Sequence, residues 1–327
     1  MRKLTLVLFI VILQISCDNK NNPKYIPKSS GNINTLSVVM EKELWNSPVG
    51  DSIRAIFSSE FLGLPQQEAV LTLKHIPISA FSGFFRESRN ILIIEKSTNA
   101  EWGLNLDQYA KPQLVFIIKD QKNTNIIKKL KEKKEIIIKK VQENELAEKQ
   151  RRMRISPLKK TELKSVMALD ILMPSVYELF KKDNNKFWFQ KETKNGSINI
   201  LIYEMEKIKN IQLYDLQKII ELRDSIGKIF VPGRNVGSYM LTEKAYEPYF
   251  KRMKIKEFNA IETRGTWELK NDFMAGPFLN YMINDTVNNR FLMLDGFVFS
   301  PSSRKREMIF EIEAIYKSLK IYKKESK

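Results

Sequence analysis

Residues 278–299 read FLNYMINDTVNNRFLMLDGFVF, and this stretch decides the fold of the C-terminal half of the chain. Two apolar and aromatic runs, 278–283 and 290–299, flank the mostly polar stretch 284–289. A polar turn between two such runs is typical of a β-hairpin and favours antiparallel pairing. Ser300-Pro301 then predicts the start of a terminal helix that runs to about residue 321.

The region before the hairpin predicts further strands at residues 166–173, 186–190 and 198–203, and an amphipathic helix at 213–226. The loop 231–238 contains Gly233 and Gly237. It lacks the following GK[ST] of a P-loop and the third glycine of a dinucleotide-binding loop. No nucleotide motif is therefore predicted there.

The N-terminal half alternates strands and helices. Short apolar runs at residues 35–40, 70–73, 91–94 and 114–118 predict strands, and 114–118 is expected to be central. Ser47-Pro48 predicts a helix start, residues 79–85 a short aromatic helix, and residues 123–154 a long lysine-rich helix. Ser156-Pro157 predicts another helix start and a boundary near residue 155.

The fold class predicted from these patterns is α+β, with mixed or antiparallel sheets and packed helices. We expect two α/β-type subdomains. The first covers residues 34–155 and includes the basic helix, and the second covers 156–327 and includes the terminal hairpin and helix.

The N-terminus predicts export. Arg2 and Lys3 precede the ten-residue stretch LTLVLFIVIL, which is too short to span a bilayer but typical of a signal peptide. Ser16-Cys17 follows, and Cys17 is the only cysteine, so residues 1–16 read as a lipoprotein signal peptide and Cys17 as its lipidation site. Gln14 stands where a lipobox usually has leucine, which leaves ordinary cleavage or an uncleaved anchor as alternatives. Residues 17–33 read as a flexible tether.

Composition excludes several kinds of site. One cysteine and one histidine leave no intramolecular disulfide, no cysteine-rich zinc site and no paired-histidine metal site, so we expect no metal and no cofactor. His75 is interpreted as a polar cap at the end of a strand rather than a general base. Of the net charge of +17, much lies in residues 119–164, which hold 16 Lys or Arg against 7 Asp or Glu. This run predicts a solvated helical face or a surface for anionic lipid or polymer.

A weak binding patch is predicted at Arg264, Trp267 and Asp272. Arg264 could hold an anionic group, Trp267 could stack on a ring and Asp272 could position a hydroxyl. The structural alternative places Trp267 in the core and pairs Arg264 with a carboxylate. No carboxylate pair can be chosen as catalytic from the sequence alone.

Several stretches together resemble a known family. They include Glu43-Leu44-Trp45, Gly63-Leu64-Pro65, His75-Ile76-Pro77, Arg264-Gly265-Thr266-Trp267-Glu268 and Asp295-Gly296-Phe297-Val298. The chain resembles an uncharacterised family of Bacteroidota lipoproteins that is defined only as a domain of unknown function. The resemblance implies a lipidated cysteine and an exported body, and it supplies no catalytic residues.

The expected function is that of a lipid-anchored cell-envelope protein, a binding or structural module carrying palmitate or a similar acyl chain. The alternative is an envelope hydrolase or transferase acting on glycan or lipid. Expected partners are membrane lipid through the anchor and an envelope protein or glycan, whereas export disfavours nucleic acid. The resemblance implies a rule for localisation, since in such bacteria an acidic run just after the cysteine accompanies export to the outer face. Asp18-Asn19-Lys20 is not such a run, so the outer membrane and its periplasmic face are expected.

Overall fold

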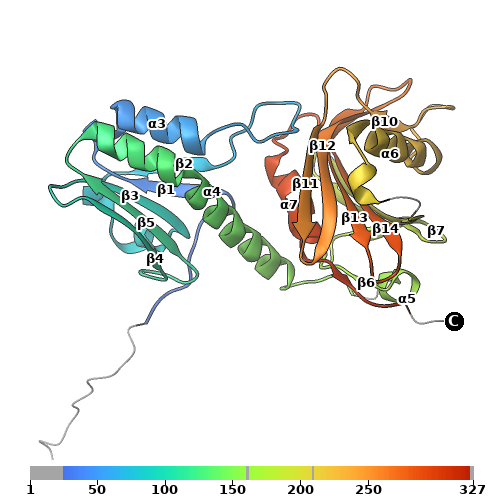
Figure 1. The fold of residues 1–327 in the computed structure, drawn as a ribbon, viewed down its shortest axis with the longest axis horizontal. Helices are drawn as coiled ribbons and strands as arrows, with labels where there is room; N and C mark the ends of the chain where they lie inside the picture. The colour runs from blue at the N-terminus through green and yellow to red at the C-terminus, as the bar shows by residue number, and fades with distance from the viewer. Residues whose placement is uncertain (1–24, 160–161, 208–209, 325–327) are drawn as a thin grey trace, which may run out of the picture.

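The computed structural model describes residues 25–159, 162–207 and 210–324. They form an N-terminal and a C-terminal unit, each with its own main sheet, and the long helix α4 (Asn123–Met153) extends from the first towards the second (Figure 1). One sheet is mixed and the other antiparallel, and helices pack on both. The predicted α+β class is confirmed.

The sheet of the N-terminal unit has the order β2-β1-β3-β5-β4. Its first four strands are parallel and β4 runs antiparallel to β5. Parallel strands are covered on both faces, which explains the continuous apolar runs in the sequence. The bounds are β1 (Thr35–Val39), β2 (Thr72–Ile76), β3 (Asn90–Lys96), β4 (Glu101–Leu106) and β5 (Leu114–Asp120).

Helices cover one face of this sheet. After the short α2 (Lys42–Trp45), α3 (Pro48–Phe57) begins where Ser47 Oγ accepts a hydrogen bond from the Val49 amide, and it packs beside α4 (Figure 1). The other face is covered by side chains that include Phe81 and Tyr109. The single aromatic helix predicted over residues 79–85 is wrong, because the chain forms two separate 3₁₀ turns there, η1 (Ile78–Ala80) and η2 (Gly83–Glu87).

The lysine-rich run is largely a solvated helix face. Lys128 and Lys140 lie within 4.0 and 3.5 Å of Glu132 and Glu143 on the same helix. Such exposed pairs each contribute little to stability. The inner side of α4 differs, because fully buried Glu145 accepts hydrogen bonds from Arg89 Nε at 2.8 Å and from the Asn34 amide at 2.9 Å.

The segment predicted as a flexible tether is partly structured. Ser29 N donates to Lys111 O at 3.0 Å, Ser30 N donates to Glu87 O at 2.8 Å, and Arg89 Nη2 donates to Asn32 O at 3.0 Å. Residues 28–33 are therefore held against the N-terminal unit by hydrogen bonds of their backbone groups. Amino-acid composition describes side chains, so it could not predict these contacts. Cys17, the predicted signal peptide and the first part of the tether lie outside the described residues.

The sheet of the C-terminal unit is antiparallel, in the order β10-β12-β13-β14-β9-β8-β7, and β11 also pairs with β12. The predicted hairpin is confirmed, with register from Phe278↔Phe297 to Asp285↔Arg290. The bounds are β7 (Glu178–Asp183), β8 (Lys186–Thr193), β9 (Gly196–Glu206), β10 (Met240–Thr242), β11 (Tyr249–Ile255), β12 (Phe258–Leu269), β13 (Ala275–Asp285) and β14 (Arg290–Phe299).

Both faces of this sheet are covered. The terminal helix α7 (Arg306–Tyr316) packs on one face, and α6 (Leu216–Phe230), which follows η3 (Ile211–Leu213), packs on the other. The predicted strand at 166–173 is wrong, because α5 (Leu163–Met167) ends at Ala168, whose φ of 50° turns the chain into the short β6 (Leu169–Asp170). β6 pairs with β15 (Lys320–Ile321), so the terminal helix ends earlier than predicted.

The two units are joined by specific contacts. The Glu68 carboxylate accepts hydrogen bonds from the amides of Lys305 and Arg306 at 2.6 and 3.2 Å, at the start of α7. Gln150 of α4 donates to Ala314 O at 2.9 Å. A helix start needs acceptors for its free amides, so a residue of the N-terminal unit caps a helix of the C-terminal unit.

Candidate functional site

The structure separates the three residues of the predicted patch. Arg264 and Trp267 both lie on β12, three positions apart, so they project from opposite faces of the sheet. Asp272 lies in the turn between β12 and β13. The three side chains do not line one pocket, and each has its own environment.

Trp267 is a core residue. Its side chain is 2% exposed, its Nε1 donates to Val298 O at 3.2 Å, and its ring meets Phe297 edge-on at 5.4 Å. A tryptophan with its N–H satisfied inside the core has no face available to a ligand.

Asp272 shapes a surface turn. It accepts hydrogen bonds from Arg234 Nη2 at 2.8 Å and from the Phe273 amide at 2.8 Å. The Arg234 hydrogen bond lowers the pKa of Asp272. The pair joins the loop after α6 to the turn after β12.

Arg264, which is 13% exposed, lies at the centre of a largely buried cluster on the α7 face of the sheet. Its Nε donates to Glu262 Oε1 and its Nη2 to Glu313 Oε2 of α7, both at 2.8 Å. The ring of Phe61, from the N-terminal unit, lies 5.3 Å from the guanidinium carbon. We call Arg264, Glu262, Glu313 and Phe61 the Arg264 clamp.

The electrostatics of the clamp follow from its burial. Burial alone would raise the pKa of Glu313, but the charges of Arg264 and Lys317 lower it to about 2. Burial likewise acts to lower the pKa of Arg264, and Glu313 with Glu262 more than offsets this and raises it. Tyr281 completes the cluster by donating its hydroxyl to Glu262 Oε2 at 2.8 Å. Both carboxylates are therefore held by donors.

The clamp borders a groove of about 950 Å³ between the two units, which we call the interunit groove. One wall comes from α4 with Ile138, Gln142 and Leu146, and the facing wall from β11 with Tyr249, Lys251 and Met253. Figure 1 shows α4 on one side of this region and β11 and α7 on the other. Residues 60–62 and the clamp form one end of the interunit groove.

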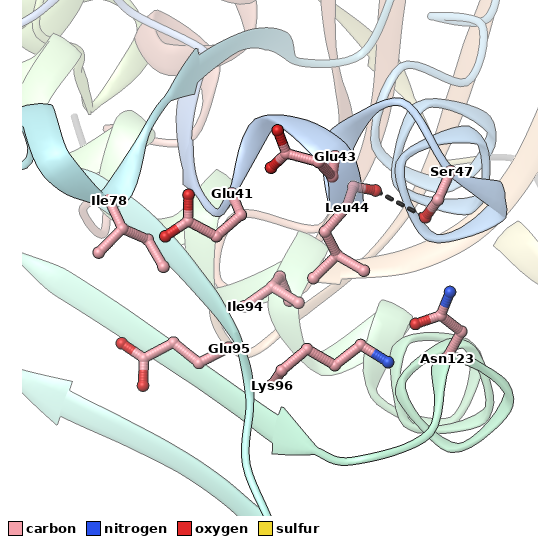
Figure 2. A pocket seen from close by; sticks show the side chains of 9 residues that line it. All are labelled: Glu41, Glu43, Leu44, Ser47, Ile78, Ile94, Glu95, Lys96 and Asn123. Atoms are coloured by element: carbon pink, nitrogen blue, oxygen red, sulfur yellow. Dashed lines mark hydrogen bonds between the residues drawn. The ribbon is translucent and has the colours of Figure 1, made fainter.

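A second, smaller hollow of about 650 Å³ lies at the carboxyl ends of the parallel strands. Figure 2 shows Glu41, Glu43 and Leu44 after β1 opposite Ile94 and Lys96 at the end of β3. Between β1 and β3 the chain connections diverge, and ligands of open parallel sheets commonly bind at such a point.

Most polar groups of this second hollow have partners. Lys96 Nζ donates to Gln121 O at 2.7 Å, Glu95 pairs with Lys119 at 3.3 Å, and Ser47 Oγ donates to Leu44 O at 2.7 Å. The interunit groove is larger and draws on both units. We therefore take it as the main candidate.

Sequence reasoning found Arg264 but missed the rest of the groove. Phe61 and Glu313 lie 203 and 49 positions away along the chain and carry no motif. The alternation of Glu262 and Arg264 on a strand with an apolar opposite face was the available signal for a buried ion pair.

His75 agrees with its interpretation as a cap, because its Nε2 lies 3.0 Å from Met40 O and its ring stacks on Trp45.

Within residues 25–159, 162–207 and 210–324, no group of three or more His, Cys, Asp or Glu side chains is placed to hold a metal ion. In the same described part of the chain, no helix combines the length and apolarity needed to cross a bilayer.

Comparison with known proteins divides the chain at the end of α4. Residues 29–154 match the model described as domain of unknown function DUF8532, and residues 156–318 match domain of unknown function DUF4837. Both units match uncharacterised families. The clamp therefore joins Phe61 of the DUF8532 region to Arg264, Glu262 and Glu313 of the DUF4837 region.

Similarity beyond these families is slight. The solution structure of cyanobacterial PsbP (CyanoP) from Synechocystis sp. PCC 6803 is similar with a TM-score of 0.33 and 8% identity, over 50% of this chain and 91% of that one. No curated protein matches the sequence.

Proposed function

We propose that this chain is a lipid-anchored binding module of a bacterial cell envelope, and that its partner occupies the interunit groove. The observation that carries the proposal is the groove itself, because residues of both units line it and the Arg264 clamp closes one end. Concave sites at the boundary between units are common ligand sites, and this one is lined by apolar and charged side chains in similar numbers.

The groove suits binding better than hydrolysis. Glycoside hydrolysis needs a carboxylic acid that is protonated near neutral pH, which requires a raised pKa. Glu313 has the opposite shift, to about 2, and stays ionised. Burial does raise the pKa of Asp295, but that side chain is 1% exposed beneath α6, where it pairs with Arg223.

The anchor rests on the sequence. A basic start, a ten-residue apolar stretch and a single cysteine after Ser16 support cleavage before Cys17 and its lipidation. Several acyl chains hold a protein at a membrane far more firmly than one. The lack of an acidic run after Cys17 favours the periplasmic face of the outer membrane.

The proposal for the groove is tested by site-specific photo-crosslinking in intact cells that produce the protein. A photoreactive amino acid replaces Gln142 or Leu62 at the groove, or Leu106 on the edge strand β4 as a matched exposed control. We expect adducts of defined mass from the two groove positions and none from Leu106. Adduct yields at the groove no higher than at Leu106 would contradict the proposed site.

The anchor is tested separately by fractionation. Cys17→Ser should move the protein from the membrane fraction to the soluble envelope fraction. Retention of a normally processed Cys17→Ser variant in membranes would refute lipidation without affecting the groove.

A further inference from the structure

β11 is an edge strand whose free side has no backbone partner. It pairs with β12 from Tyr249↔Arg264 to Ile255↔Phe258, and no other described strand pairs with it. In the described part of the chain, no backbone hydrogen bond joins its outer edge to another segment. An edge strand with free amides and carbonyls is a template for another extended chain.

This free edge lies along the interunit groove. Tyr249, Lys251 and Met253 of β11 line the groove, and Figure 1 places β11 at the margin of the C-terminal unit that faces α4. An extended peptide can add to an exposed sheet edge by main-chain hydrogen bonds, and its side chains then meet those of the edge strand.

The register of β11 defines what such a peptide would meet. Tyr249 and Lys251 pair with Arg264 and Glu262, so their side chains lie on the same face of the sheet as the clamp. Tyr249 is 49% exposed and Lys251 is exposed, with no carboxylate within ion-pair distance among the described residues. Met253 follows two positions later on this face.

We propose that the groove binds an extended segment of another envelope protein as an added strand along β11, with an acidic side chain beside Lys251 between two apolar ones. This inference rests on the proposed function and names the partner class for the same site. Neighbouring side chains on adjacent strands interact in pairs, so Tyr249 and Met253 select apolar partners and Lys251 selects a carboxylate.

The charge of β11 argues against a second copy as the occupant. The strand carries Lys251, Arg252 and Lys254 within four positions. Two such strands side by side would bring like charges together, which disfavours pairing. An acidic segment removes this repulsion.

The test uses two labelled peptides, Thr-Val-Thr-Glu-Thr-Val-Thr and its counterpart with lysine in place of glutamate. Binding to the full chain carrying Cys17→Ser is followed by fluorescence anisotropy. We expect the glutamate peptide to bind about tenfold more tightly than the lysine peptide. N-methylation of alternate peptide nitrogens on the pairing edge should abolish binding, because it removes main-chain donors while keeping the side chains.

Lys251→Glu should reverse the preference between the two peptides. Lys254→Glu is the matched control, because Lys254 is also exposed on the same strand but projects from the opposite face. Circular dichroism confirms that both variants fold.

Three results would overturn the inference: no binding of either peptide, equal effects of Lys251→Glu and Lys254→Glu, or undiminished binding after N-methylation. A chain that dimerises in solution through β11, with the dimer lost in Lys251→Glu, would also overturn it in favour of self-association. Photo-crosslinks from Gln142 and Leu62 would still support the groove as a binding site, so failure of the strand inference is distinguishable from failure of the proposed function.

Discussion

Replacing Arg264 with methionine should destabilise the C-terminal unit by about 3 kcal/mol at neutral pH. The value follows from Glu313, which is 13% exposed and whose pKa is lowered from 4.5 to about 2 by Arg264 and Lys317. A shift of that size corresponds to about 3 kcal/mol of differential stability at about 1.4 kcal/mol per pKa unit. Removing Arg264 also leaves Glu262 without its cation. The two largely buried carboxylates then lose the positive charge that offsets the cost of removing them from water.

The pH dependence has a definite sign. A carboxylate whose pKa is lower in the folded state stabilises the protein above its unfolded value and loses this contribution as the pH falls towards its folded value. For Glu313 the window runs from about pH 5 to pH 2. The native protein should therefore lose stability across this window, and Arg264→Met should flatten that part of the profile.

The assay is urea unfolding at 25 °C across this pH range, followed by tryptophan fluorescence and far-ultraviolet circular dichroism. Lys218→Met is the control, because it breaks the ion pair of Lys218 with Glu221 on α6, whose side chains are 54% and 50% exposed, and its effect should be within error. The double variant Arg264→Met with Glu313→Gln should recover most of the loss. If Arg264→Met unfolds like Lys218→Met, or keeps the native acid profile, the reasoning about the clamp is refuted.

Trp267→Ala should lower the free energy of unfolding by about 3–5 kcal/mol in the same assay, because it leaves a cavity in the core and removes the indole donor to the Val298 carbonyl. A loss below about 1 kcal/mol would contradict the assignment of this side chain to the core. Glu145→Ala should cost about 3 kcal/mol by removing the carboxylate that buried Arg89 contacts at 2.8 Å and leaving it only Glu148 at 3.8 Å, and joint replacement of Glu145 and Arg89 by leucine and methionine should be milder. A double variant worse than the single one would contradict this. Gly63→Ala should lower the unfolding midpoint, since Gly63 has φ 83° and an added Cβ would lie 2.7 Å from Arg264 Cβ; an unchanged midpoint would contradict that close approach.

Elements with a strong local signal were predictable from the sequence. Apolar runs and turn residues predicted the hairpin of β13 and β14, the helix α4 and the strand β5. Tertiary contacts did not change the secondary structure of these elements. The expected helix from Ser47-Pro48 starts as predicted, whereas its end at Phe57 has no comparable signal in the sequence. Its start was specified by a cap and its end was not.

The remaining errors have physical causes. β12 was missed because Thr263 and Gly265 interrupt the apolar face that carries Ile261 and Trp267, which weakens the two-residue alternation. The predicted helix start at Ser156-Pro157 is instead a bridge from Pro157 to Pro174, a long-range pairing without local signature. The groove could not be predicted, because its walls come from segments that only the tertiary fold brings together.

The cap that Glu68 provides to α7 bears on the order in which the molecule folds. Donor and acceptor lie 237 and 238 positions apart, so this contact closes only after almost the whole chain has been synthesised. Contacts of such sequence separation form slowly, and domains usually fold from the N-terminus during synthesis. The N-terminal unit can thus present Glu68 before α7 emerges, and α7 becomes the last large element to dock, onto an acceptor that is already in place. A chain shortened before Lys305 should leave the hydrophobic face under α7 uncovered and become a substrate for chaperones or proteases rather than a smaller working protein.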